Sequence, residues 1–204
     1  VGGTMRLGPV AVLHALQDLR GSGGSLRGVP GATLDVDGNV DLSGVAAHPT
    51  GVPDIRCNGD WTADGVFAPT GSTVFLDGTG SLVAGGPLTF GHLEVFAGTR
   101  TVAGNANITA LDVFVRPPAL LRQGANTLRL VTAAIEIQGV QEVGAGGTLQ
   151  LGPAAALHVA VGGRMSLVGT LAQPAAVDGA PLGGYGFVVD GTIEAMNFAF
   201  SRMG

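Results

Sequence analysis

The sequence predicts an all-β fold, a single-stranded and right-handed parallel β-solenoid (β-helix) of roughly nine coils. Three observations predict it. The composition is rich in glycine and proline and poor in charged residues, one segment of the chain recurs, and short strand-like runs alternate with turn residues. A β-sandwich is the alternative, because Asp-Gly turns favour hairpins. We expect residues 1–204 to form one solenoid domain that is a fragment of a longer chain.

The composition excludes several other classes. Glycine accounts for 36 of the 204 residues and proline for 11, and glycine on this scale excludes a helical bundle. An apolar fraction of 46% and a net charge of −5 exclude a disordered chain. The acidic balance with scattered arginines argues against nucleic acid as a partner. No stretch of about 20 residues is apolar enough for us to expect a membrane span.

The clearest organisation is an internal repeat. Residues 2–14 read GGTMRLGPVAVLH and residues 146–158 read GGTLQLGPAAALH, with nine of the thirteen positions identical. Shorter glycine-rich segments that resemble the start of this repeat lie between the two copies. They recur about every 20–25 residues, a period that is typical of a solenoid.

Short runs with alternating apolar residues lie between the glycine-rich marks, and each is bounded by Gly, Pro, Asn or Asp, as short strands are. We expect strands at residues 73–76, 93–96, 108–113, 135–137, 157–161 and 187–189, with a further one over 192–200. Residues 9–20 also fit a helical stripe, but their repeat partner alternates, so a strand is favoured there. Five Asp-Gly dipeptides, such as Asp77-Gly78, tolerate positive φ and indicate turns.

One block of the chain resembles a known family. It carries a tryptophan, an Asx-Gly turn, an aromatic residue, a proline and a Thr-Val-x-Phe strand, in this order: Trp61, Asp64-Gly65, Phe67, Pro69 and 73–76. This order resembles a recurring phrase of very large bacterial exported proteins, and residues 88–95 resemble the coil that follows it there. The GGTLxLGPxAxL units resemble coils of right-handed β-helix adhesins and filamentous-haemagglutinin-like surface proteins. The resemblance implies a secreted or cell-surface location and brings no catalytic residues.

The densest polar segment is 34–42, in which every second residue is Asp or Asn. Alternation along one strand would place four oxygen-bearing side chains on one face, a candidate Ca²⁺ site: Asp35, Asp37, Asn39 and Asp41. The segment departs from an EF-hand loop, because Val40 stands where glycine is needed and Ala46 where glutamate is. A solvated strand face whose charges discourage aggregation is the favoured alternative. We therefore expect no cofactor, with Ca²⁺ as the one alternative.

The histidines and the single cysteine indicate no further site. His14 and His158 occupy the same place in the two repeat copies, so the repeat accounts for them without metal chemistry. We expect no metal at His48 or His92 either. Cys57 has no His, Asp or Asn at a nucleophile spacing, and we expect a buried, inert thiol.

Carbohydrate chemistry is the main enzymatic alternative, because β-helices also host pectate-lyase-like enzymes. Asp54, Arg56, Asp60 and Asp64 lie close together in the sequence and supply the residue types that such sites use. Against this, a sugar groove needs aromatic platforms, and the chain has one Trp and one Tyr. The longest candidate loop, residues 46–60, is short for a groove.

The sequence thus favours a non-catalytic structural or adhesive segment of a bacterial extracellular or surface-anchored repeat protein. A polysaccharide-binding or polysaccharide-degrading β-helix and a phage or viral fibre segment are the alternatives. The expected partners are flanking domains of the same polypeptide, further copies joined end to end, and a polysaccharide or cell surface.

Overall fold

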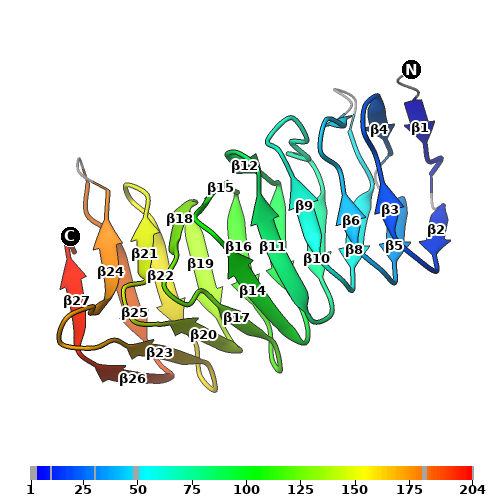
Figure 1. Cartoon of the computed structure of the whole chain (residues 1–204). Helices are drawn as coiled ribbons and strands as arrows, with labels where there is room; N and C mark the ends of the chain where they lie inside the picture. Colours follow the sequence, from blue (N-terminus) through cyan, green and yellow to red (C-terminus); the bar gives the residue numbers. More distant parts are fainter. Residues whose placement is uncertain (1–3, 10, 30, 48–50, 181–182, 204) are drawn as a thin grey trace.

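The structure is a computed structural model that describes residues 4–9, 11–29, 31–47, 51–180 and 183–203. These residues form short parallel strands wound into a β-solenoid of about nine coils, which runs from the N-terminal end to the C-terminal end in one direction (Figure 1). The predicted all-β parallel solenoid is confirmed, and the sandwich alternative is wrong because every paired strand among the described residues is parallel to its neighbour. A right-handed winding stays a prediction. Within the described ranges, no helix is long and apolar enough to cross a membrane.

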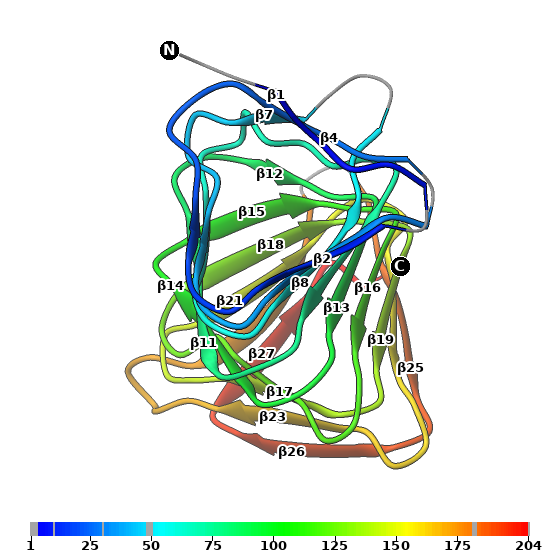
Figure 2. The same ribbon diagram turned by 90° about the vertical axis from the view of Figure 1, so that its right-hand side faces the viewer.

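The strands form three faces of the solenoid, which Figure 2 shows in a view down the solenoid axis. Face 1 is a nine-stranded sheet that contains β2 (Val12–Ala15), β5 (Thr33–Val36), β8 (Asp54–Cys57), β10 (Thr73–Leu76), β13 (His92–Val95), β16 (Asp112–Val115), β19 (Ala134–Ile137), β22 (Ala156–Val159) and β25 (Gly186–Val189). Face 2 is a nine-stranded sheet that contains β3 (Leu19–Arg20), β6 (Val40–Asp41), β9 (Trp61–Ala63), β11 (Gly80–Ala84), β14 (Thr99–Ala103), β17 (Leu120–Arg122), β20 (Val140–Val143), β23 (Arg164–Val168) and β26 (Thr192–Met196).

Face 3 is divided into two sheets. The first contains β1 (Thr4–Arg6), β4 (Ser25–Arg27) and β7 (Ala46–Ala47). The second contains β12 (Leu88–Thr89), β15 (Ala106–Thr109), β18 (Thr127–Val131), β21 (Thr148–Leu151), β24 (Ala175–Gly179) and β27 (Phe198–Ser201). The two sheets are separated by the loop formed by residues 64–72, in which Phe67 is buried.

The strand register fixes the length of a coil. Paired residues on face 1 are 19 to 22 positions apart from β2 to β22, as in the pair Thr73 and His92. Between β22 and β25 the spacing rises to 30, as Ala156 pairs with Gly186. Part of this extra length is loop 169–174, which lies between β23 and β24. The predicted period is confirmed, and the two repeat copies lie at the same corner, between faces 3 and 1, in the first and eighth coils.

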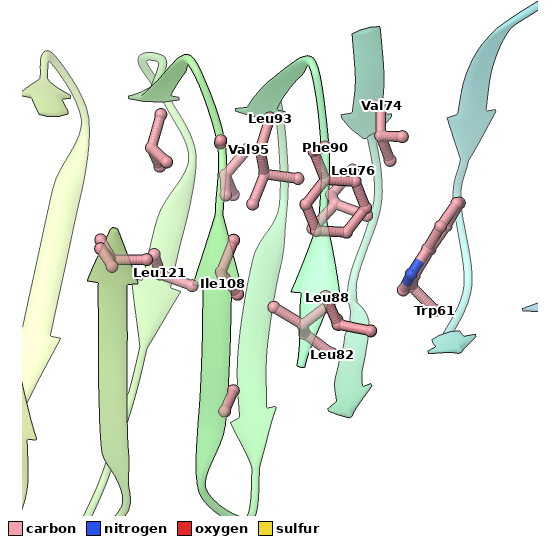
Figure 3. Close-up of a cluster of buried hydrophobic side chains, with 14 of the residues drawn as sticks. Trp61, Val74, Leu76, Leu82, Leu88, Phe90, Leu93, Val95, Ile108 and Leu121 are labelled. Carbon is pink, nitrogen blue, oxygen red and sulfur yellow. The ribbon is translucent and has the colours of Figure 1, made fainter. Parts of the chain in front are cut away.

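The core consists of inward-facing ladders of aliphatic side chains, one residue from each coil. On face 1, one ladder contains Leu34, Ile55, Val74, Leu93, Val113, Ile135 and Leu157, all buried. Figure 3 shows the middle of the core, where Trp61 and Phe90 lie among such residues. Burial of each large apolar side chain stabilises the fold by about 1.5–3 kcal/mol.

Several predicted strands coincide with strands of the structure, including 73–76 and the N-terminal segment, where β2 and β3 replace the helical alternative. Three predicted continuous strands are wrong because each contains a corner of the solenoid. Residues 34–42 contain the corner between β5 and β6, and residues 108–113 contain that between β15 and β16. Residues 192–200 are interrupted at Asn197, which has φ 49°.

The glycines at the corners between faces 1 and 2 are needed mainly because successive coils approach each other closely. Of the five Asp-Gly dipeptides, only Asp64-Gly65 has its glycine at positive φ, so conformational freedom does not explain the glycine in the other four. At Gly78, an added Cβ would lie 2.1 Å from the carbonyl oxygen of Asn58 in the preceding coil. At this position, a methyl group has no room unless the backbone moves.

We therefore predict opposite outcomes for two glycines of the same coil. Gly78→Ala is expected to lower the free energy of unfolding by about 1–3 kcal/mol, the usual cost of forcing a methyl group into a packed site. Gly71→Ala, where no atom lies within 4 Å of the added Cβ, is expected to be neutral or slightly stabilising. Urea denaturation of both variants measures the difference, and equal losses would contradict the close-approach explanation.

Candidate functional site

The outer surface of face 1 carries a column of side chains that differs from the aliphatic interior. Strand register places one residue from each of five successive coils in this column: Arg56, Phe75, Glu94, Phe114 and Glu136. Neighbouring residues in such a column are about 4.8 Å apart along the axis. Aromatic, basic and acidic groups from different coils therefore contact each other directly.

The first cluster in the column is centred on Arg56. Its Nη1 donates a hydrogen bond of 2.9 Å to Oδ2 of Asp77 in the next coil. The guanidinium lies 4.4 Å from the ring centre of Phe75 and 5.5 Å from that of Phe96. The two rings meet edge to face at 6.3 Å. One cation thus bridges three coils through a carboxylate and two aromatic rings.

The second cluster is centred on Arg116, which follows β16. Its Nε and Nη2 donate to the two carboxylate oxygens of Glu94 at 3.2 and 3.1 Å, and Nη1 donates to Oε1 of Gln138 at 3.2 Å. The hydrogen bonds to Glu94 raise the pKa of Arg116. The guanidinium also lies 4.4 Å from the ring centre of Phe114. This arginine connects the coils before and after its own.

Each histidine in the described part of the chain pairs with an aspartate of the following coil on face 1. The nitrogen–oxygen distances are 3.0 Å from His14 to Asp37, 2.7 Å from His92 to Asp112 and 3.0 Å from His158 to Asp190. The hydrogen bond to Asp37 raises the pKa of His14. His48 lies outside the described residues. His14 and His158 are on the first and eighth strands of face 1, so no single metal ion can contact both.

The structure divides the four Ca²⁺ candidates between two places. Asp35 and Asp37 approach His14, with nitrogen–oxygen distances of 4.0 and 3.0 Å. Asn39 lies at the corner between β5 and β6 and Asp41 lies on β6, so the prediction of one shared strand face is wrong. Among the described residues, no group of three or more His, Cys, Asp or Glu side chains is placed to hold a metal ion. Calcium binding by Asp35, Asp37, Asn39 and Asp41 stays a prediction.

Asn39 belongs instead to a ladder of side-chain caps along the corner between faces 1 and 2. Its backbone N–H donates to Oδ1 of Asp18 at 2.9 Å, and its own Oδ1 accepts from the backbone N–H of Asp60 at 2.7 Å. Oδ1 of Asp60 in turn accepts from the N–H of Ser81 at 2.6 Å. The hydrogen bond from Asn39 lowers the pKa of Asp18. Four consecutive coils are thereby joined at one corner.

The four residues suggested for carbohydrate chemistry lie at different places around their coil. Asp54 and Arg56 are on β8, Asp60 is at the corner before β9, and Asp64 follows β9. Oδ1 of Asp54 accepts from the N–H of Thr73 at 2.8 Å, and Oδ2 of Asp64 accepts from that of Gly44 at 2.7 Å. Their carboxylates therefore cap neighbouring coils.

The aromatic residues most suited to stacking on sugars are inside the solenoid. Trp61 and Tyr185 are both buried, and burial raises the pKa of Tyr185 to about 12. The candidate loop 46–60 contains β7 and β8, so it is wrong as a loop. Where the connection between strands is described in full, the longest non-strand segments are 64–72 and 169–174.

Cys57 is buried in an inward ladder between Val36 and Leu76, and burial raises the pKa of its thiol. The same corner contains Arg100, which is fully buried. Its Nη2 donates to the carbonyl oxygens of Cys57 and Gly78 at 3.1 and 3.3 Å, and its Nη1 donates to that of Gly59. Burial lowers the pKa of Arg100. This arginine acts as an internal cap for backbone carbonyls.

Sequence reasoning missed the Arg56 and Arg116 clusters and the inward position of Arg100. The signal for the clusters is the spacing of the column, since Arg56, Phe75 and Glu94 recur at intervals of 19 residues. The signal for Arg100 is its place two residues before the inward Val102. Both signals can be recognised in the sequence once the length of each coil is known.

Comparisons with protein-family models, curated proteins and solved structures find no match for this chain. Its function is therefore inferred from its own residues.

Proposed function

We propose that the chain is a structural and adhesive segment of a bacterial extracellular or surface-anchored repeat protein, and that it has no catalytic role. The observation that carries the proposal is the bracing of face 1 along the axis. Arg56, Arg116 and three histidines each bond to a residue of another coil. A shaft built in this way resists bending and separation of its coils, because a lateral load is shared among several inter-coil contacts.

The same face supports an adhesive role. It is a broad parallel sheet of nine strands, and it presents aromatic and charged groups at its surface. Phe96 is 41% exposed beside the Arg56 cluster. An aromatic edge beside an arginine is a common composition of binding surfaces. The outermost strands of the face, β2 and β25, each have a neighbour on one side, so flanking coils or further copies are the partners we propose at the ends.

The proposal is tested by attachment and turnover measured on the same preparation. Beads coated with the protein are expected to attach to glycan-bearing cell or matrix surfaces under flow, while soluble polysaccharides incubated with it release no reducing ends or unsaturated products. Depolymerisation would overturn the proposal in favour of a polysaccharide-degrading β-helix. Sedimentation as a trimer would favour a fibre segment, and absence of attachment would contradict the adhesive role.

A further inference from the structure

A small pocket lies on the outer surface of face 2, away from the clusters of face 1. Its cavity volume is about 330 Å³, and it is lined by Arg122, Gly124, Glu142, Val143, Gly144, Ser166 and Val168. Strand register aligns three of these residues, because Arg122 pairs with Glu142 and Glu142 pairs with Ser166. Three successive coils thus present a guanidinium, a carboxylate and a hydroxyl group in one row.

The floor of the pocket is bare backbone. Gly124 and Gly144 are stacked at the corner between faces 2 and 3, where the N–H of Gly144 donates to the carbonyl of Gly124 at 2.9 Å. A Cβ on Gly144 would lie 3.2 Å from backbone atoms of Gly124. The absence of side chains at these two positions leaves the cavity open beside the polar row.

Loop 169–174 lies beside one end of the pocket. Six residues lie between Val168 and Ala175, whereas Asn197 alone lies between their register partners Met196 and Phe198 in the next coil. The chain leaves β23 as the gold loop at the lower left of Figure 2 and bends back, so that the carbonyl of Gln173 accepts a hydrogen bond of 3.1 Å from the N–H of Gly146. Insertions into a regular repeat commonly lie on its binding face.

The polar groups of the pocket retain free hydrogen-bonding capacity. Nε of Arg122 donates to Oε2 of Glu142 at 2.7 Å. In the part of the chain that the structure describes, no further hydrogen bond joins the Nη groups of Arg122, Oε1 of Glu142 or the Ser166 hydroxyl to another group. Ser166 is 8% exposed and pairs with Glu142 in the outward row, so its side chain belongs to the pocket lining. A ligand in the pocket can take the place of water at these polar groups.

We propose that this pocket binds an uncharged, hydroxyl-rich saccharide unit. The charges of Arg122 and Glu142, which are in contact at 2.7 Å, compensate each other, so the polar row has no net charge that would favour an ionic ligand. Neighbouring sugar hydroxyls both donate and accept, so they match the free N–H groups, the carboxylate oxygen and the hydroxyl without breaking the pair. Val168, which is 43% exposed, supplies an apolar contact for the C–H groups of the ring. The cavity is at the small end of ligand sites, about 300–1,000 Å³, as expected for one or two sugar units.

This inference rests on the proposed adhesive function, for which it names a ligand class and a site. The test is titration of the ¹⁵N-labelled protein with neutral cello-, manno- and galacto-oligosaccharides and with acidic oligogalacturonates. A neutral oligosaccharide is expected to shift the amide signals of Gly124, Gly144 and Ser166. Ser166→Ala and Arg122→Ala are expected to weaken that binding at least tenfold. Thr101→Ala, in the same outward row one coil before Arg122, is the matched control and should bind as the wild type does.

Two outcomes would overturn the inference while leaving adhesion intact. The first is that no saccharide, or only the acidic ones, shifts these amides although coated beads still attach. The second is that both pocket variants, shown to be folded by circular dichroism, bind as tightly as the Thr101→Ala control. Failure of the wild-type beads to attach, with saccharide binding retained, would contradict the adhesive function alone.

Discussion

Leu151→Asp is expected to abolish folding. Leu151 is fully buried on β21, where its inward side chain follows Leu130 in the ladder of face 3. The substitution removes a large apolar side chain and places a carboxylate in a core that offers it no partner. A loss of about 4–5 kcal/mol or more, characteristic of an unpaired buried charge, is comparable to the whole stability of many domains.

The neighbouring Gln150→Asp is the matched control and is expected to leave the fold intact. Gln150 is outward-facing on the same strand, and its register partners are Arg129 and Asp178. Far-ultraviolet circular dichroism and urea denaturation of both variants measure the difference. If the two substitutions were equally damaging, or if Leu151→Asp folded normally, the assignment of inward and outward positions on this face would be wrong.

The sequence shows the alternation of buried and exposed residues on which this prediction depends, but it does not show where the corners of the solenoid lie. In segment 34–42, Leu34, Val36, Val40 and Leu42 are all buried although the chain turns between β5 and β6. The apolar pattern continues through the corner because corner residues also face inward or outward. A change of backbone direction depends on dihedral angles that this pattern does not record. Long alternating runs therefore predict single strands where the structure has two strands joined by a corner.

The candidate sites were harder to predict because they depend on register. A period of about 20–25 residues is enough to recognise a solenoid. It is too coarse to align Phe75 with Glu94 and Phe114, since successive coils here differ in length by one or two residues. An error of one residue exchanges the inward and outward sides. The pocket on face 2 depends on register in the same way, because its polar row aligns Arg122, Glu142 and Ser166 from three coils.

Arg100→Ala is expected to lower the free energy of unfolding by about 2–4 kcal/mol. The guanidinium donates to three carbonyl oxygens from two earlier coils, and its side chain lies over Gly80, where an added Cβ would be 2.9 Å from Nη1. Alanine would leave these buried carbonyls without that donor and would open a cavity at the corner. Burial of the charge opposes this loss, as the lowered pKa of Arg100 indicates, so the net effect is smaller than the sum of the three bonds.

A second variant separates hydrogen bonding from packing at Arg100. Arg100→Met refills the cavity but donates no hydrogen bond, so it is expected to recover only part of the lost stability. The control is Arg20→Ala, at an exposed arginine whose side chain is 73% accessible, and it should change stability little. A second readout is the rate at which Cys57 reacts with a thiol reagent in the folded protein. Cys57 lies under the same corner, so Arg100→Ala should accelerate this reaction and Arg20→Ala should not. If Arg100→Met fully restored the free energy of unfolding, Arg100 would stabilise the corner by filling space. The three carbonyl oxygens would then need no hydrogen-bond donor from a side chain.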